Sequence, residues 1–264
     1  MKFTKMHGLG NDYLYVYGEV PGNAAELSKK LSERHLGAGS DGMIYISTSN
    51  IADFKMRIFN ADGSEAKMCG NGIRCVGKYV YDKGYTDKKF LSIETLSGVK
   101  YLTLQIVGGK VKTITVDMGQ AEAEKAMNLT VDGETVSLFP VSVGNPHAVI
   151  FVDDIEKAPL TKLGPIIEHH EAFPDGVNVE FVQVLGADKL RMRVWERGSG
   201  VTMACGTGAC ASVMAAIAAK LFHYDETVSV LLDRGTLKIQ IAPDNTVQMT
   251  GPAEIVYEGE TEIC

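Results

Sequence analysis

Residues 56–72 read MRIFNADGSEAKMCGNG, and residues 192–208 read MRVWERGSGVTMACGTG. The two stretches align without a gap at a constant offset (205 − 69 = 136), which is about half of the 264-residue chain. A strand, a loop and a Cys-Gly-x-Gly turn that enters a helix have therefore been duplicated. If the copies face each other, Cys69 and Cys205 approach one ligand from opposite sides. Such a pair suits inversion at carbon, where one group removes a proton and another delivers one to the opposite face.

Length and composition favour two globular domains and exclude several classes of protein. An apolar fraction of 45% gives each half, roughly 130 residues, enough material for its own core. The net charge of −7 comes from 26 basic and 33 acidic residues without a Lys/Arg cluster, so we expect neither nucleic acid nor a membrane surface as partner.

The N-terminus lacks the apolar core of a signal peptide, and the longest largely apolar stretch, residues 209–219, is too short to span a bilayer. Five cysteines without a Cys-x-x-Cys spacing predict a reduced, cytoplasmic protein with no metal site.

Strand patterns dominate the chain. Apolar and polar residues alternate over 102–106, 113–118 and 237–241, which indicates half-buried antiparallel strands. Helices are expected at residues 24–36, 71–83, 160–170 and 207–222. The first of these follows Asn23, with Glu26 placed to complete a capping box. Each half therefore combines several strands with two helices, which predicts the α+β class.

Each Cys-Gly-x-Gly turn places a thiol at a helix start. Its glycines let the backbone turn tightly, and the helix behind presents N–H groups that can bind a carboxylate. The same N–H groups favour thiolate over thiol. The alternative is that a cysteine is simply a small buried apolar residue. We keep that interpretation for Cys75, Cys210 and Cys264, whereas the repeated pair Cys69 and Cys205 favours chemistry.

The N-terminal segment from His7 to Asp12 contains Gly8-x-Gly10, which resembles the start of a dinucleotide fingerprint. The final glycine is missing and no helix follows, so we reject dinucleotide binding. The glycines instead predict that Asn11 is exposed to a ligand; the alternative is a tight polar turn.

Two segments of the second half carry further candidate residues. Gly144-Asn145-Pro146-His147 interrupts an apolar strand and predicts a bulge or turn, in which His147 either tunes a nearby thiol or is structural. Glu196 and Arg197 occupy the places that are Asn60 and Ala61 in the first half. Charges on one side only indicate an asymmetric ligand, with Arg197 binding a carboxylate and Glu196 an ammonium group. The alternative is an exposed ion pair.

Together these segments resemble the diaminopimelate epimerases, and the match covers nearly the whole chain. It rests on seven segments: residues 5–12, 57–64, 68–75, 144–147, 178–180, 195–198 and 204–208. The resemblance implies two pseudo-symmetric α+β domains, each a mainly antiparallel sheet curled around a central helix. In this family the C-terminal strand returns to the first domain, which implies domains at 1–116 plus 257–264 and at 117–256.

The resemblance also implies an activity: cofactor-independent interconversion of LL- and meso-2,6-diaminopimelate, in lysine and peptidoglycan precursor synthesis. Cys69 and Cys205 would carry the protons, and His147 and Glu196 would tune them. The carboxylate at the reacting carbon would be bound by the backbone N–H groups of Gly70, Asn71, Gly206 and Thr207. Asn11 would also hold the reacting end. Five residues would recognise the distal end: Asn60, Asn145, Asn178, Glu196 and Arg197. The expected partner is a small molecule, and a homodimer is left open.

Two positions depart from the family pattern. Gly42 stands where many relatives have a glutamine that contacts substrate, which puts one contact in doubt. Thr207 stands where many have serine, which is harmless if the contact is made by the backbone.

Three alternatives stay open at this point. One is another isomerase of the same scaffold, such as a proline or hydroxyproline racemase, which has no need of Glu196 and Arg197. The others are a redox-sensing module in which Cys69 and Cys205 form a disulfide, and a purely structural protein.

Overall fold

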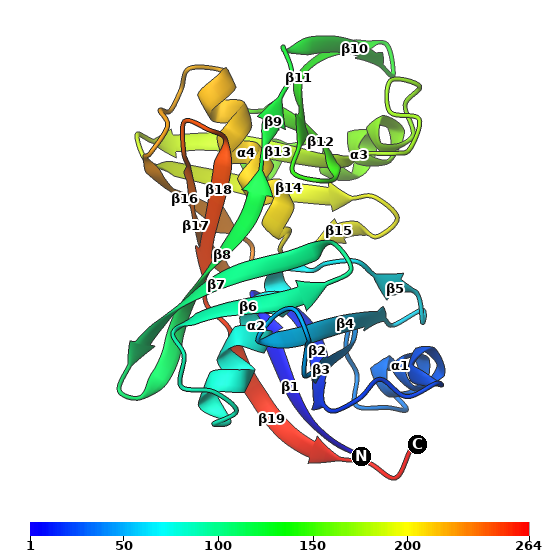
Figure 1. Cartoon of the computed structure of the whole chain (residues 1–264). Helices are drawn as coiled ribbons and strands as arrows, with labels where there is room; N and C mark the ends of the chain where they lie inside the picture. Colours follow the sequence, from blue (N-terminus) through cyan, green and yellow to red (C-terminus); the bar gives the residue numbers. More distant parts are fainter. Residues whose placement is uncertain (264) are drawn as a thin grey trace. The chain divides into compact units, whose positions relative to one another are not determined.

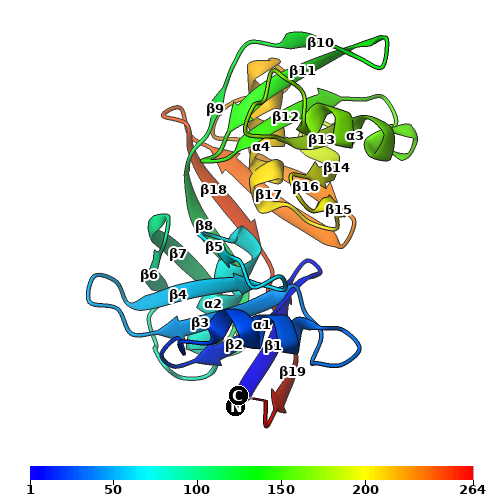
Figure 2. The ribbon, with the colours of Figure 1, turned by 90° about the vertical axis from the view of Figure 1, so that its right-hand side faces the viewer.

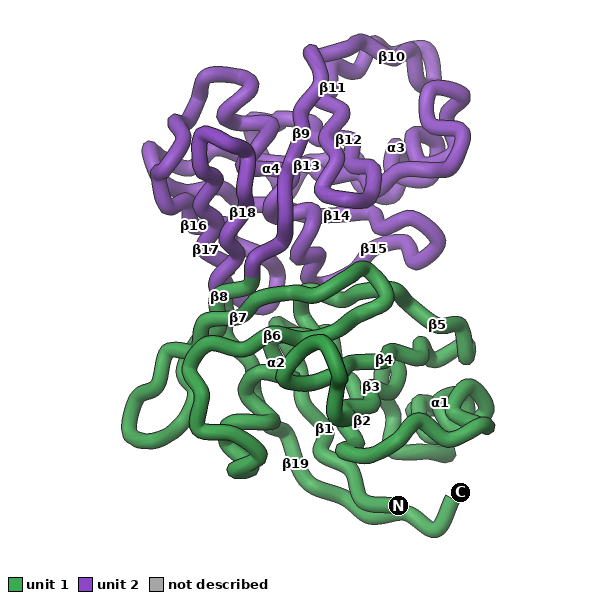
Figure 3. Tube along the Cα trace, in the orientation of Figure 1, with its two compact units in different colours: residues 1–116, 251–264 green, residues 117–250 purple. Residues whose placement is uncertain are grey.

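A computed structural model describes residues 1–263 and divides the chain into two compact units. Unit 1 comprises residues 1–116 and 251–264, and unit 2 comprises residues 117–250 (Figure 3). Cys264, for which we expect no chemical role, lies outside the described residues.

Unit 1 is a mainly antiparallel sheet with two helices. Its strands are β1 (Lys2–Gly8), β2 (Asn11–Tyr17), β3 (Gly42–Ser47), β4 (Phe54–Asn60), β5 (Glu65–Ala66), β6 (Phe90–Thr95), β7 (Gly98–Val107), β8 (Lys110–Gln120) and β19 (Glu254–Glu260). Its helices are α1 (Ala24–Ser32) and α2 (Gly70–Asp82). The late strand β19 pairs antiparallel with β1, so the first and the last strand of the chain lie side by side in this unit (Figure 1).

Unit 2 repeats this construction. Its strands are β9 (Glu122–Ala123), β10 (Met127–Val131), β11 (Glu134–Ser142), β12 (Pro146–Phe151), β13 (Asn178–Gly186), β14 (Lys189–Glu196), β15 (Gly200–Thr202), β16 (Thr227–Leu232), β17 (Gly235–Ile241) and β18 (Thr246–Gly251). Its helices are α3 (Leu160–Glu168) and α4 (Gly206–Ala218), preceded by a 3₁₀ turn at Ile155–Lys157.

The strand pairings show that the whole unit is duplicated, not only the cysteine segment. In unit 1, β1 pairs antiparallel with β2, which runs parallel to β3, and β3 pairs antiparallel with β4. In unit 2, β11, β12, β13 and β14 make the same three pairings in the same order. The pattern continues with β4 parallel to β6 and β14 parallel to β16. The predicted α+β class is confirmed.

One helix of each unit is almost entirely enclosed. In α2 every residue from Asn71 to Val80 is buried, and the helix packs against β1, β2 and β7. In α4 every residue from Gly208 to Ile217 is buried, and strands of unit 2 surround it (Figure 2). Because a fully enclosed helix has no freedom to tilt, the position of its first turn is fixed by the sheet around it.

Helix starts agree with expectation better than helix ends. The helix expected over 24–36 ends at Ser32, because the chain turns back and the N–H groups of Ala38 and Gly39 bond to Leu31 O. The expected capping box is wrong. The Asn23 backbone (φ −101°, ψ 20°) lies outside the extended region that an N-cap requires, and its side chain makes no cap bond.

No helix in the described part of the chain is both long and apolar enough to cross a membrane.

Helix α3 fixes the segment that follows β14. Glu168, its last residue, is 6% exposed, and its two carboxylate oxygens have different donors. Trp195 Nε1 donates to one at 2.6 Å, and the Gly198 N–H donates to the other at 2.7 Å. Between these donors lie Glu196 and Arg197, so one buried carboxylate holds both ends of the charged pair.

Glu168→Ala should therefore lower the free energy of unfolding by about 1.5–3 kcal/mol, since Trp195 Nε1 and the Gly198 N–H both lose a charged acceptor. Urea denaturation of the full chain measures this. Glu171→Ala is the matched control, because Glu171 lies three residues further on and is exposed. Equal stability of the two variants would contradict the anchoring role of Glu168.

Candidate active site

Each repeated cysteine is the N-cap of the enclosed helix of its own unit. Cys69 (φ −141°, ψ 114°) and Cys205 (φ −116°, ψ 114°) have extended backbones, as N-cap residues do. The Cys69 Sγ accepts the Gly72 N–H at 3.2 Å, and the Cys205 Sγ accepts the Gly208 N–H at 3.3 Å. Both sulfurs therefore sit at the positive end of a helix, with further N–H groups beside them.

The second glycine of each turn leaves room for the residue behind it. A Cβ at Gly72 would lie 2.7 Å from Ile44 Cδ1, and a Cβ at Gly208 would lie 2.6 Å from Glu180 Oε1. Ile44 and Glu180 occupy the same place in the repeat (44 + 136 = 180). The same helix start is thus backed by an apolar side chain in unit 1 and by a carboxylate in unit 2.

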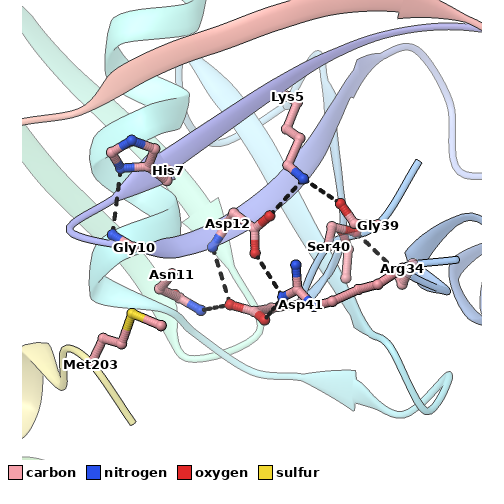
Figure 4. A network of polar contacts seen from close by, with 12 residues as sticks. Lys5, His7, Gly10, Asn11, Asp12, Arg34, Gly39, Ser40, Asp41 and Met203 are labelled. Atoms are coloured by element: carbon pink, nitrogen blue, oxygen red, sulfur yellow. Dashed lines mark hydrogen bonds and ion pairs between the residues drawn. The ribbon is translucent and has the colours of Figure 1, made fainter. Parts of the chain in front are cut away.

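In unit 1 the amide of Asn11 contacts the cysteine. Its Oδ1 lies 3.4 Å from Cys69 Sγ and 3.5 Å from Asn71 Nδ2. Its Nδ2 donates to Asp41 Oδ2 at 2.8 Å (Figure 4). Because an ionised carboxylate only accepts, Asp41 fixes the amide with its oxygen toward Cys69.

Asp41 was missed by the sequence reasoning, and it belongs to a charged network. Arg34 donates to Asp41 at 2.8 Å and to Asp12 at 3.2 Å, and Lys5 pairs with Asp12 at 2.9 Å (Figure 4). The only sequence signal for Asp41 is its place directly before Gly42.

Gly42 and Asn60 lie opposite each other where β3 and β4 pair. A Cβ at Gly42 would lie 2.2 Å from Phe59 O, so a glutamine at this place requires a different path of the backbone. Asn60 Nδ2 donates to Ser64 Oγ at 3.1 Å.

In unit 2 four polar residues form a chain that ends at the cysteine. His147 Nδ1 lies 2.7 Å from Glu180 Oε1, and both side chains are completely buried. His147 Nε2 lies 3.2 Å from Asn145 Oδ1, and Asn145 Nδ2 donates to Thr207 Oγ1 at 3.3 Å. Thr207 Oγ1 lies 3.5 Å from Cys205 Sγ. Asn145 lies in the turn between β11 and β12, as predicted for this segment.

Glu180 was assigned no role by the sequence reasoning. A single acidic residue within the apolar run 177–182 was the available signal, since such a charge is costly to bury.

Three residues of the predicted distal-end set meet where β14 ends. Asn178 is buried, accepts the Arg197 N–H at 2.9 Å and donates to Pro146 O at 3.1 Å. The Arg197 side chain is exposed and donates to Asp175 O at 2.7 Å. Glu196 accepts a hydrogen bond from the Thr202 hydroxyl.

The surroundings of Cys205 correct one expectation. Burial raises the pKa of its thiol well above the usual value, and the negative charges of Glu196 and Glu180 raise it further. The Thr207 hydroxyl and the Gly208 N–H lower the pKa, as expected at a helix start, but they are outweighed. Burial likewise raises the pKa of Glu196. Burial raises the pKa of Cys75 to about 12, which suits the absence of a chemical role.

Among residues 1–263, no three His, Cys, Asp or Glu side chains are grouped so that they could hold a metal ion.

A family model described as "Diaminopimelate epimerase" matches residues 3–124 and 139–256. A diaminopimelate epimerase of Acetivibrio thermocellus is 48% identical over 279 aligned positions, covering 100% of this chain and 99% of the relative. One of Bacteroides thetaiotaomicron is 51% identical over 265 positions, covering 99% of this chain and 98% of the relative.

Solved structures that are distant in sequence share the fold. A phenazine biosynthesis protein from Bacillus anthracis superposes with a TM-score of 0.80 at 16% identity, covering 100% of this chain and 99% of its own. A probable proline racemase from Agrobacterium radiobacter superposes with a TM-score of 0.74 at 16% identity, covering 100% of this chain and 93% of its own. By its matching residues and its identity to relatives along the full length, this chain belongs to the diaminopimelate epimerase family.

Proposed function

We propose that this protein is a cytoplasmic isomerase that interconverts LL- and meso-2,6-diaminopimelate without a cofactor, in lysine and peptidoglycan precursor synthesis. Each unit serves as one epimerase-like domain and contributes one thiol. The observation that carries the proposal is the pair of cysteine N-caps, Cys69 and Cys205, each with its sulfur at the start of an enclosed helix.

The reaction moves one proton off carbon and another on. One cysteine, as thiolate, takes the α-proton, and the electron pair left on carbon is delocalised into the adjacent carboxylate. The other cysteine, as thiol, delivers its proton to the opposite face of that carbon. The two sulfurs thereby exchange protonation states, so the next turnover runs in the reverse direction or follows a proton exchange with solvent.

The backbone N–H groups at the two helix starts supply most of the acceleration. Proton transfer by a positioned side chain contributes typically ~10²–10⁴-fold. Charge on the carboxylate grows in the transition state, and preorganised N–H donors stabilise it without reorganising. The groups proposed for this are the N–H groups of Gly70, Asn71, Gly206 and Thr207, with the Asn11 side chain beside them.

Recognition of the non-reacting end is proposed first for Glu196 and Arg197, the charged pair that stands where the first half has Asn60 and Ala61. Arg197 binds the distal carboxylate and Glu196 the distal ammonium group. Asn60, Asn145 and Asn178 complete the set. Asn178 supports this assignment, because its contact with the Arg197 N–H fixes the backbone that carries the charged pair.

Removing either thiol tests the mechanism. Cys69→Ala and Cys205→Ala should each reduce epimerisation of diaminopimelate at least ~10²-fold, since each lacks one proton carrier. Chiral separation of the isomers under reducing conditions measures the rate. Cys75→Ala and Cys210→Ala are matched controls, because these cysteines lie further along the same helices. A fully active Cys69→Ala or Cys205→Ala variant would refute the mechanism.

Arg197→Met tests recognition of the distal end. Loss of a charged hydrogen-bonding partner, worth ~1.5–3 kcal/mol, should lower kcat/KM about 10- to 100-fold. Arg193→Met is the control, since Arg193 lies on β14, four residues before Arg197, and has Arg57 as its counterpart in the repeat. If the two variants lose the same activity, Arg197 has no special role in the specificity.

The raised pKa of Cys205 predicts a pH dependence of its reactivity. Only the thiolate is alkylated, so the alkylation rate of Cys205 in the absence of substrate should rise at a pH above that of an ordinary thiol, ~8.5. Glu196→Gln removes a negative charge, favours the thiolate and should move this rise to lower pH. Peptide mass spectrometry after iodoacetamide treatment reads each cysteine separately. An unchanged profile in Glu196→Gln would rule out the charge effect.

A further inference from the structure

We propose that Glu180 is a positioning residue: through His147 and Asn145, it directs the hydroxyl hydrogen of Thr207 onto the sulfur of Cys205. The proposal rests on the proposed role of Cys205 as a proton carrier. Its test reads the thiol in the absence of substrate, so its failure is distinguishable from a lack of epimerase activity.

The first step is to count the hydrogens on the Glu180–His147 pair. His147 Nε2 lies 3.2 Å from Asn145 Oδ1, an atom that only accepts, so Nε2 carries a hydrogen. The 2.7 Å contact between His147 Nδ1 and Glu180 Oε1 needs one more hydrogen, which the two groups share. The pair is therefore neutral as a whole, which agrees with its complete burial.

The second step is the direction of the hydrogen bonds beyond the pair. Because Asn145 Oδ1 receives the hydrogen of His147, its Nδ2 points to Thr207 and donates to Oγ1 at 3.3 Å. A hydroxyl has one hydrogen, and here its oxygen is already engaged as an acceptor. That hydrogen is then available to Cys205 Sγ, which lies 3.5 Å away.

Unit 1 has the same scaffold, but the asparagine amide at the matching place is oriented the other way. In the parallel strand pairs, Tyr15 lies opposite Ile44 and Val149 lies opposite Glu180. Counting back along β2 and β12 places Tyr13 where unit 2 has His147, and Asn11 where it has Asn145. Asn11 turns its oxygen toward Cys69, because Asp41 takes its nitrogen.

The energetics favour a functional reason for Glu180. Its side chain is completely buried, and Oε2 has no hydrogen-bond partner among the described residues. An unpaired buried acceptor costs stability, whereas the apolar Ile44 fills the same place in unit 1 without that cost. Packing alone therefore does not account for a carboxylate here.

Two carboxylates of unit 2 act on the thiol, Glu180 from β13 and Glu196 from β14, and His147 from β12 contacts Glu180. If Glu180 acted only by its negative charge, removing it would favour the thiolate, as Glu196→Gln does. If it acts by directing the Thr207 hydroxyl, removing it takes away a donor and disfavours the thiolate. The two roles thus predict opposite signs.

The experiment is a pH titration of iodoacetamide reactivity, read at the Cys205 peptide with the Cys69 peptide as internal reference. Thr207→Val removes the hydroxyl and should lower the thiolate fraction of Cys205 at a given pH about tenfold. Thr207→Ser keeps the hydroxyl and should leave the profile in place.

Glu180→Leu, which has an apolar side chain as in unit 1, should shift the pH profile of Cys205 reactivity in the same direction as Thr207→Val. Glu180→Gln should not, because its amide N–H can donate to His147 Nδ1 and preserve the direction of the chain. The double variant Glu180→Leu/Thr207→Val should be no worse than Thr207→Val alone, since both act along one path. Equal shifts to lower pH in Glu180→Gln and Glu180→Leu would overturn the proposal in favour of bare charge. Unchanged profiles in all variants would overturn it as well.

A second measurement needs no substitution at Glu180. ¹⁵N NMR of the histidine rings in the wild-type chain should show a hydrogen on His147 Nε2 at neutral pH. A bare Nε2 would reverse the direction of the chain and contradict the proposal.

Discussion

The bond from a backbone N–H to a cysteine sulfur is the constraint on which the rest of the site depends. In each unit the third residue after the cysteine donates to Sγ, at 3.2 Å in unit 1 and 3.3 Å in unit 2. The donor is at the start of a helix with at least ten consecutive buried residues, so the sheet around the helix fixes the sulfur. The donor is a glycine in both units, and a Cβ there would have to displace the end of the Ile44 or the Glu180 side chain. The position of the thiol therefore depends on the helix start, and the position of the helix start depends on the packing of the sheet.

Both units contain this arrangement, but they differ in the polar residues around the cysteine. The enclosed helix and its cysteine cap are common to both. The polar surroundings are not: Asp41 orients Asn11 in unit 1, whereas His147 and Glu180 orient Asn145 in unit 2. Two asparagines at matching places thus turn opposite ends of their amides toward the cysteine side. In the proposed reaction, in which one thiol gives a proton while the other takes one, these unequal surroundings would act differently on the two thiols.

Local signals allowed the sequence to predict the α+β class, the repeat and the starts of the enclosed helices, since glycines and a cap residue are neighbours in the chain. Features that depend on tertiary packing could not be predicted from the sequence. The capping box at Asn23 is wrong because the Asn23 backbone is not extended. Asp41 and Glu180 were missed because their partners, Asn11 and His147, are distant in the sequence. Nothing in the sequence indicated that burial and two carboxylates would outweigh the helix start and raise the pKa of Cys205.

The most direct test of the central claim, that two separate thiols serve the two faces of one carbon, is early turnover in D₂O. With LL-diaminopimelate as substrate, the meso product should acquire deuterium at the reacting carbon while the remaining LL-isomer stays unlabelled. Early and equal labelling of both isomers would show that one group serves both faces, and would contradict the account.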